Sequence, residues 1–309
     1  MKIYKPYFWS RPKNIISLIL LPITFLVLIF IILKKKITNT KKFKIPILCI
    51  GNIYIGGTGK TPLSIALASE FRSLGKKPVI IKKFYKGHKD EHLLIKDRAI
   101  PLISEKNRAS SIELAEKNFD LAILDDGFQD YKIKKDLNIL CFNNKQLIGN
   151  GHVFPSGPLR ESLSAIKRAQ IAVINGEKNL IFEKKLKTIN SDLEVFYSKY
   201  KLTNQEELKN KNILAFAGIG NPENFFDLLI ENGLSVKKTL AFPDHYNFKR
   251  KEILEIIEQA KDKNYTILTT EKDFFRIKNF EFSEITPCKV NLEILEKLKL
   301  MSLIKKIYD

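Results

Sequence analysis

Cysteine is scarce in this sequence and is not clustered. Three of the 309 residues are cysteines, Cys49, Cys141 and Cys288, with no C-x-x-C pair and no Cys/His cluster. A disulfide framework and a structural zinc site are therefore not expected, and a reducing compartment is favoured. The sequence also lacks internal repeats and low-complexity tracts. Its hydrophobic fraction of 44%, beside 28% charged residues, excludes a disordered chain and a polytopic membrane protein.

Acidic residues are absent from the start of the chain, since the first one is Glu70. Residues 1–44 contain ten of the 53 basic residues, so this segment carries more than half of the formal net charge of +19. Such a charge is compatible with nucleic acid, an anionic membrane or a phosphate-rich substrate. Because these basic residues flank an apolar run, we expect anionic membrane lipid as the partner, no nucleic acid, and no evident protein partner.

The apolar run from Ile15 to Leu33 has nineteen residues and no charge. As a helix it would be about 28 Å long, close to the hydrocarbon thickness of a bilayer. Aromatic residues typical of an interfacial anchor precede it: Tyr4, Tyr7, Phe8 and Trp9. A cleaved signal peptide and a buried core helix fit less well. We predict an N-terminal membrane helix; spanning and partial embedding both stay open, and Pro22 is a site for a kink.

From Lys44 onward, short apolar runs alternate with helical patterns, which indicates a parallel-sheet α/β protein. The expected strands are Pro46–Ile50, Pro78–Ile81, Leu121–Leu124, Leu137–Phe142, Ile171–Ile174, Ile213–Ala217, Val236–Ala241 and Thr266–Thr269. Expected helices include Thr61–Leu74 and Pro222–Glu231, each followed by a stopping glycine. The lysine-rich stretch from Glu177 to Lys211 is compatible with two linking strands and a domain junction.

The segment GNIYIGGTGKTP, Gly51 to Pro62, follows an expected strand and opens an expected helix, as a phosphate-binding loop does. Its glycines allow backbone N–H groups to turn towards phosphate at a helix N-terminus. Lys60 would reach the β- and γ-phosphates, and the Thr61 hydroxyl would ligate Mg²⁺. The predicted nucleotide-binding residues are Gly56, Gly57, Thr58, Gly59, Lys60 and Thr61. Tyr54 departs from the usual glycine, and a plain glycine turn is the alternative.

A second nucleotide-site feature is LAILDDGFQD, Leu121 to Asp130. In such folds the carboxylate that holds Mg²⁺ follows an apolar strand. If both still lie in the strand, Asp125 and Asp126 point to opposite faces, so that one serves the metal and the other caps a turn or binds elsewhere. A common Asp-Asp-Gly turn is the alternative.

These motifs predict a P-loop NTPase-like parallel-sheet domain over residues 45–195, after an anchor over residues 1–44. A second, smaller α/β domain is expected over residues 196–309. A switch ATPase of the partitioning or division type would share the loop and the membrane contact. It would also carry a signature lysine at the position of Ile55, so it is the weaker alternative.

Several separated motifs, taken in order, make the chain resemble the tetraacyldisaccharide 4′-kinase (lipid A 4′-kinase) family over nearly its full length. After the basic N-terminal segment and the phosphate loop come KDE at Lys89–Glu91, LDDGFQD at Leu124–Asp130, GNGHVFPSGPLRE at Gly149–Glu161, AFAGIGNPENFF at Ala215–Phe226, FPDHYNF at Phe242–Phe248 and LTTEKDFFR at Leu268–Arg276. Apart from the phosphate loop each motif alone is weak, but the ordered set is specific.

The resemblance implies a phosphotransferase that moves the γ-phosphate of ATP to the 4′-hydroxyl of a tetraacylated glucosamine disaccharide 1-phosphate, with Mg²⁺. This acylated disaccharide lipid is a lipid A precursor. The catalytic domains would lie at the cytoplasmic face of the bacterial inner membrane. The family has two α/β domains with the active site in the cleft between them.

The resemblance also implies roles for single residues. Asp90 would be the catalytic aspartate that accepts the proton of the sugar hydroxyl, and His245 its partner, reaching across from the second domain. Glu91 would join Asp125 and Asp126 in bearing on Mg²⁺ or its waters. The acceptor and phosphate region would be lined by Tyr85, Arg108, Gln129 and Arg160. Plain alternatives are a solvated charged loop for Asp90 and Glu91, and a turn for His245.

The sequence departs from the family pattern at three places. Where the family usually has S-R-G-Y, this chain has Lys82, Lys83, Phe84 and Tyr85. Lys89 replaces the usual glycine before the Asp-Glu pair, and Asp130 replaces the usual histidine of the D-D-G-x-Q motif. The arginine and the glycine of the first motif are therefore replaced by Lys83 and Phe84 in this chain.

Overall fold

The computed structural model describes residues 6–85 and 89–308, which divide into two compact units. The larger unit comprises Lys5–Phe84, Ile100–Lys199 and Leu292–Asp309, and the smaller one consists chiefly of Tyr85–Ala99 and Tyr200–Asn291. The change of unit near residue 200 lies close to the expected boundary. The smaller unit, however, takes a helix from the middle of the expected nucleotide-binding domain, and the C-terminal residues belong to the larger unit.

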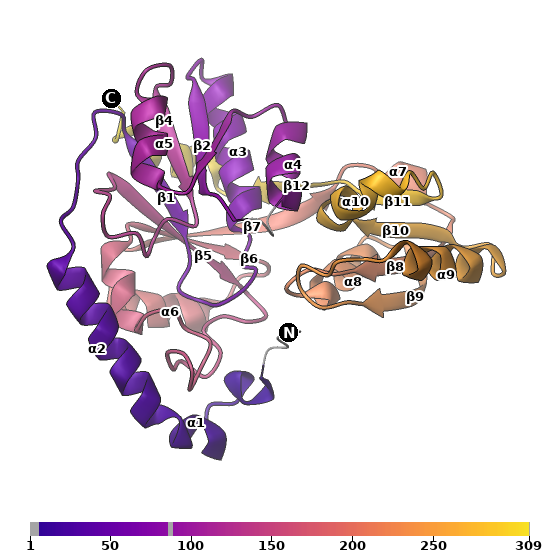
Figure 1. The fold of residues 1–309 in the computed structure, drawn as a ribbon, viewed down its shortest axis with the longest axis horizontal. Helices are drawn as coiled ribbons and strands as arrows, with labels where there is room; N and C mark the ends of the chain where they lie inside the picture. The colour runs from indigo at the N-terminus through magenta and orange to yellow at the C-terminus, as the bar shows by residue number, and fades with distance from the viewer. Residues whose placement is uncertain (1–5, 86–88, 309) are drawn as a thin grey trace. The chain divides into compact units, whose positions relative to one another are not determined.

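The larger unit contains an eight-stranded sheet in the order β12-β7-β6-β5-β1-β4-β2-β3, and the strands from β7 to β3 pair in parallel (Figure 1). The strands are β1 Ile47–Gly51, β2 Pro78–Lys83, β3 Leu102–Glu105, β4 Leu121–Asp125, β5 Leu137–Asn143, β6 Ile171–Asn175, β7 Glu194–Leu202 and β12 Val290–Ile294. Five of these were predicted from apolar runs. The carboxyl ends of β1 and β4 are adjacent, because these two strands pair directly.

Helices α3 and α5 contact the strands β1 to β4. The helical elements of the larger unit are η1 Tyr7–Ser10, α1 Ile15–Ile19, α2 Leu21–Ile37, α3 Lys60–Ser73, α5 Arg108–Ala115, η2 Leu163–Arg168, α6 Leu180–Ile189 and α11 Lys297–Lys305. Helix α6 replaces the first of the two linking strands expected after Glu177. Asn179 caps it by accepting a hydrogen bond from the Phe182 amide, and Phe182 and Leu186 bury one face.

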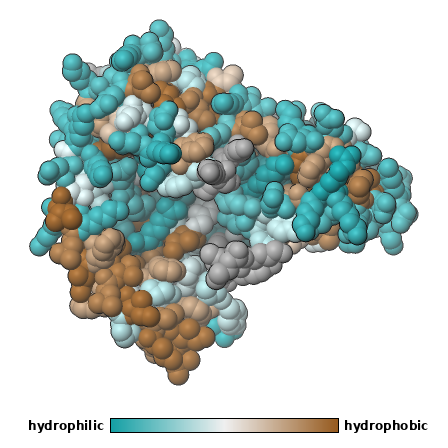
Figure 2. Space-filling model, in the orientation of Figure 1, coloured by the Kyte–Doolittle hydropathy of each residue, from teal (hydrophilic) through white to brown (hydrophobic). Residues whose placement is uncertain are grey.

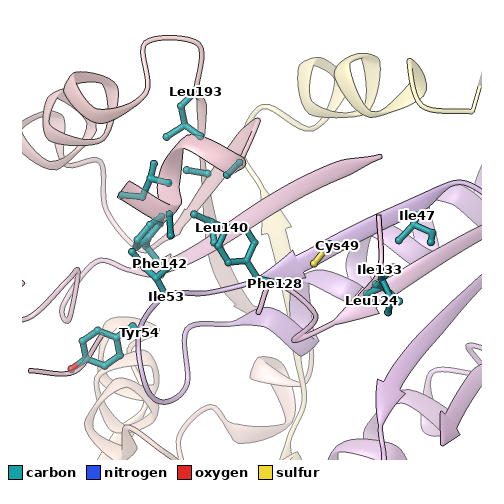
Figure 3. Close-up of a cluster of buried hydrophobic side chains, with 14 of the residues drawn as sticks. Ile47, Cys49, Ile53, Tyr54, Leu124, Phe128, Ile133, Leu140, Phe142 and Leu193 are labelled. Atoms are coloured by element: carbon teal, nitrogen blue, oxygen red, sulfur yellow. The ribbon is translucent and has the colours of Figure 1, made fainter. Parts of the chain in front are cut away.

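A large hydrophobic cluster lies against the sheet and supports both nucleotide motifs (Figure 3). Cys49 and Leu124 belong to β1 and β4, and Phe128 comes from the turn that follows β4. An added Cβ on Gly51 would stand 2.4 Å from the Phe128 Cβ, so glycine is required at the end of β1. The two motifs are therefore packed against each other.

The predicted single N-terminal helix is divided into α1 and α2 at Leu20. Pro22 lies in the first turn of α2, where its missing N–H has no intrahelical role. Among residues 6–85 and 89–308, no helix is both long and apolar enough to cross a membrane. Ser17 and Thr24 are buried, whereas most of the large apolar side chains of these helices are exposed.

The smaller unit contains a four-stranded parallel sheet in the order β11-β10-β8-β9. Its elements are α4 Lys89–Asp97, α7 Gln205–Leu208, β8 Asn212–Ala217, α8 Pro222–Glu231, β9 Ser235–Ala241, α9 Arg250–Lys261, β10 Thr266–Thr270, α10 Glu271–Ile277, η3 Lys278–Phe280 and β11 Ile285–Cys288. Helix α4 packs against α10. Two hydrophobic clusters stabilise this sheet, one built around Phe225 and Phe226 and the other around Phe216 and Phe248.

Candidate active site

The phosphate loop connects β1 to α3 and is held by side chains outside its glycines. Gly59 has φ 93° at the N-cap of α3, and Gly56 has φ 125°, so both need the freedom of glycine. The buried Asn52 side chain donates to the Gly56 carbonyl at 3.2 Å and to the Thr58 hydroxyl at 3.0 Å. Asn52 was not singled out from the sequence, although it lies within the motif. It fixes the shape of the loop.

Tyr54, the departure from the usual motif, has a structural role in the loop. Its side chain is buried, and its backbone forms a β-bridge with Leu159. The adjacent Ile55 amide donates to the Pro158 carbonyl at 2.8 Å, and the Arg160 amide donates to the Ile53 carbonyl at 2.7 Å. The phosphate loop is therefore paired with the GNGHVFPSGPLRE segment.

Asp125 is fully buried at the end of β4 and accepts a hydrogen bond from the Thr61 hydroxyl at 2.7 Å. Lys82 Nζ, from the adjacent strand β2, lies 2.5 Å from the same oxygen, Oδ2. The other oxygen, Oδ1, has no hydrogen-bond partner among the described residues. Sequence reasoning identified Thr61 and Asp125 but not Lys82 as part of this group.

Asp126 has a left-handed backbone with φ 60° and faces two cations. Its Oδ1 accepts from Arg160 at 2.8 Å and lies 3.7 Å from Lys60 Nζ. Burial alone would raise the pKa of Asp126, but the charges of Lys60, Arg160 and Lys82 hold it below its usual value. Both paired aspartates therefore belong to the phosphate-loop cluster, and Asp126 is ionised at neutral pH.

The residues expected to line the phosphate and acceptor region differ in their surroundings. Arg108 is buried and donates to the Asp126 carbonyl at 2.8 Å, so it supports the turn after β4. Gln129 donates to the Asn52 carbonyl at 2.9 Å and to the Glu161 carboxylate at 3.1 Å. Tyr85 is 48% exposed and belongs to the smaller unit.

Glu161 was not predicted, yet it anchors this region. It accepts two hydrogen bonds from Arg168, at 2.8 and 2.9 Å, and one from the Tyr131 hydroxyl at 2.6 Å. Burial, together with this carboxylate, raises the pKa of Tyr131 to about 12. The signal in the sequence was the Arg160–Glu161 pair, but the two side chains contact different partners.

In the smaller unit, Asp90 and His245 belong to one cluster. Asp90 is buried at the start of α4, and its Oδ2 lies 2.5 Å from Arg276 Nη2 and 3.7 Å from His245 Nδ1. Asp90 Oδ1 has no hydrogen-bond partner among the described residues. His245 was expected to reach Asp90 from another domain; in the structure α4 packs on α10, and both residues lie in the smaller unit.

Arg276 joins the parts of this cluster, and the sequence did not single it out. Its Nη1 donates to Asp273 Oδ1 and to the Gly218 carbonyl, both at 2.6 Å. Its Nη2 lies 3.2 Å from His245 Nδ1. Because arginine only donates, His245 Nδ1 accepts in this arrangement and the ring proton is on Nε2. The i, i+3 spacing of Asp273 and Arg276 on one helix was the available signal.

Asp273 ties the cluster to the sheet and to the cap of α10. It accepts from the Gly218 amide at 2.9 Å and from the Thr270 hydroxyl at 2.6 Å. Burial raises the pKa of Asp273, and the charge of Arg276 opposes that rise. Glu91, the next residue after Asp90, forms an ion pair with Lys272 at 2.7 Å and so ties α4 to α10.

A metal site made of protein side chains alone is not found in the described part of the chain, where no three His, Cys, Asp or Glu side chains gather to hold an ion. The Thr61 hydroxyl and Asp125 Oδ1, which has no hydrogen-bond partner among the described residues, fit an ion whose other ligands come from phosphate oxygens and water, as is usual for Mg²⁺. Glu91 belongs to the other unit and has Lys272 as its counterion.

Comparison with known proteins agrees with these motifs. A family model described as tetraacyldisaccharide-1-P 4′-kinase matches residues 16–309. The tetraacyldisaccharide 4′-kinase of Pelagibacter ubique is 39% identical over 316 residues, covering 100% of this chain and 99% of that protein. The protein of the same name from Bradyrhizobium diazoefficiens is 32% identical, covering 97% of this chain and 95% of that one.

The fold also has a solved counterpart. The crystal structure of LpxK from Aquifex aeolicus in complex with ATP superposes with a TM-score of 0.72 at 24% identity, and the match covers 96% of this chain and 100% of that chain. With the family model and the relatives spanning nearly the whole sequence, the chain belongs to the tetraacyldisaccharide-1-P 4′-kinase family.

Proposed function

We propose that this protein transfers the γ-phosphate of ATP to the 4′-hydroxyl of a tetraacylated glucosamine disaccharide 1-phosphate, a lipid A precursor. Family membership supports the acceptor. The observation that carries the nucleotide half is the 2.7 Å hydrogen bond between Thr61 and Asp125, because it joins the phosphate loop to the carboxylate that such a site needs. No comparable observation favours a switch ATPase.

At the nucleotide end, the chain supplies positive charge and backbone donors. The N–H groups around Gly57 and Gly59 and the start of α3 would bind phosphate oxygens, and Lys60 would neutralise the transferred group. Mg²⁺, when bound, would further neutralise phosphate charge, and Thr61 and Asp125 would hold it. Arg160, which already pairs with Asp126, would orient the same phosphates.

At the acceptor end, Asp90 would receive the proton of the 4′-hydroxyl. Its Oδ1 is the only oxygen of that carboxylate without a hydrogen-bond partner among the described residues, so it is the atom that can accept. Arg276 holds the other oxygen and orients the carboxylate. His245, with its proton on Nε2, would hydrogen-bond the substrate through that atom.

The test is a transfer assay with the full-length protein in detergent, γ-labelled ATP, Mg²⁺ and the disaccharide 1-phosphate lipid. We expect label in the lipid and loss of labelling with Lys60→Met. A well-folded preparation that binds ATP but labels no lipid would refute the proposed acceptor. Hydrolysis stimulated by bare vesicles, with no lipid product, would support the switch ATPase instead.

We also propose that α1 and α2 attach the protein to the cytoplasmic face of the inner membrane. Large apolar side chains cover their exposed side, among them Ile15, Phe25 and Phe30, which are 72%, 63% and 67% exposed (Figure 2). On the opposite side, Thr24 donates to the Ser156 hydroxyl at 2.8 Å. Burying such apolar area in lipid is favourable by about 25 cal/mol per Å².

Vesicle flotation with phosphatidylglycerol-containing liposomes tests the attachment. Phe25→Glu with Phe30→Glu should leave most protein unbound, because each carboxylate would have to enter the lipid interface. The matched control is Leu180→Glu with Ile181→Glu, which adds the same charge at exposed apolar positions of α6. Equal flotation of the two double variants would refute the proposed surface.

A further inference from the structure

Lys82 is a buried cation beside Thr61 and Asp125, the two side chains that are proposed to hold Mg²⁺. Its side chain is 6% exposed, and Nζ lies 2.5 Å from Asp125 Oδ2 and 3.3 Å from Thr61 Oγ1. The register of the sheet causes this contact, because Lys82 on β2 stands directly beside Asp125 on β4. Lysine is almost never buried to this degree unless it is paired. The ammonium therefore contacts the two side chains that are proposed to hold Mg²⁺.

The net charge of the side chains around the phosphate loop depends on Lys82. Lys60, Lys82 and Arg160 bring three positive charges, whereas Asp125 and Asp126 bring two negative ones. With a neutral residue at position 82 these charges would cancel, and a polyphosphate would be attracted only by the backbone N–H groups of the loop and by a bound divalent ion. With Lys82 the group is already positive before a metal binds.

We propose that Lys82 is a built-in cation of the nucleotide site, which lets a nucleoside triphosphate bind with little help from a divalent ion. The same ammonium opposes Mg²⁺, because both interact with Asp125 and repel each other at short distance. Because metal binding and nucleotide binding are thermodynamically linked, these two effects are described by a single coupling free energy between them. Lys82 reduces that coupling free energy. The inference rests on the proposed function only for the binding of ATP, and not for the lipid acceptor.

The experiment measures the dissociation constant of a fluorescent, non-hydrolysable ATP analogue in excess EDTA and in excess Mg²⁺, with full-length protein in detergent. For the wild type we expect the ratio of the two constants to be below about fivefold. For Lys82→Ser we expect a ratio at least about tenfold larger, equivalent to about 1.4 kcal/mol of added coupling. Binding of Mn²⁺ to the protein–analogue complex, followed by electron paramagnetic resonance, should become tighter in this variant.

The matched control is Lys83→Ser, which removes the same charge from the next residue of β2. Adjacent residues of a strand point to opposite faces, so this variant should keep the wild-type ratio. Lys82→Met retains the side-chain volume and should behave like Lys82→Ser, which separates the loss of charge from the opening of a cavity. Circular dichroism checks that each variant is folded.

Three results would overturn the inference. The first is a ratio above about a hundredfold between the wild-type dissociation constants in EDTA and in Mg²⁺. This result is obtained from the wild type alone. The second is an unchanged ratio in folded Lys82→Ser or Lys82→Met. The third is wild-type protein that binds no nucleotide in either condition, which would also refute the proposed function. A wild type that labels the lipid but shows the large ratio would leave the proposed function standing and remove only the inference.

Discussion

The nucleotide cluster of the larger unit and the Asp90 cluster of the smaller unit both place a buried aspartate beside a cation, yet they are assembled differently. In the first, Asp125 meets Thr61 and Lys82: Asp125 and Lys82 lie at or next to the ends of the paired strands β4 and β2, and Thr61 lies in the first turn of α3. In the second, Asp90 meets Arg276, a residue 186 positions away, through the packing of α4 on α10.

This difference predicts that the two clusters respond differently to the replacement of a single side chain. Backbone pairing and the core around Phe128 hold the nucleotide residues, so replacing one side chain should leave the others in place. A single guanidinium joins Asp90, Asp273 and the His245 ring, so the loss of Arg276 should disturb all three. Four substitutions test this contrast, in order of decreasing expected effect.

Asp90→Asn should have the largest effect on turnover. The amide cannot accept the proton of the substrate hydroxyl, and removing a general base typically costs about 10²- to 10⁴-fold. Binding of the ATP analogue should change by less than about twofold, because the nucleotide residues belong to a separately packed unit. Single-turnover transfer and equilibrium binding measure the two quantities.

The control for that variant is Asp97→Asn on the same helix, whose carboxylate is about half exposed. It should leave both quantities near the wild-type values. If Asp90→Asn weakened nucleotide binding as much as it slowed transfer, Asp90 would not be the acceptor base.

Lys60→Met should slow transfer by about a hundredfold and weaken binding of the ATP analogue at least about tenfold. The methionine keeps the length of the side chain but removes the charge that faces Asp126 and the phosphates. Lys77→Met, at an exposed position after α3, is the matched control. Unchanged affinity in Lys60→Met would refute the assignment of the loop.

Arg276→Met should reduce kcat by about tenfold to thirtyfold with little change in nucleotide affinity, because it leaves the Asp90 carboxylate without its counterion. Arg276→Lys should restore part of the rate, since it keeps the charge but contacts fewer partners. Nitrogen-15 spectra of His245 add a readout that a merely structural role would not move: Nδ1 should lose its donor in Arg276→Met. An unchanged His245 spectrum would argue against a positioning role.

The difference between features encoded in short segments and contacts between distant residues also decides what could be predicted from the sequence. The strands β1, β2, β4, β5 and β6, the phosphate loop and the Asp-Asp pair are encoded in short continuous segments, and the structure confirms the five strands. Strand β3 was missed because its four residues are only partly buried and carry no clear apolar pattern. The partners of Lys82 and Arg276 were missed because sheet register and helix packing over 43 and 186 positions determine them.

Thr270→Ala should give the smallest effect and the sharpest comparison between the units. Thr270 caps α10 and also holds Asp273, so its loss should lower the free energy of unfolding by about 1 kcal/mol. Because Asp273 in turn orients Arg276, kcat should also fall, by about twofold to fivefold. Asn179→Ala removes the cap of α6 in the larger unit and should cost similar stability with no change in kcat. Urea denaturation and transfer kinetics on the two variants would separate a cap that only stabilises a helix from one that also positions the acceptor base. If both variants kept the wild-type kcat, the Asp90 cluster would depend on the contacts around it no more than the phosphate loop does.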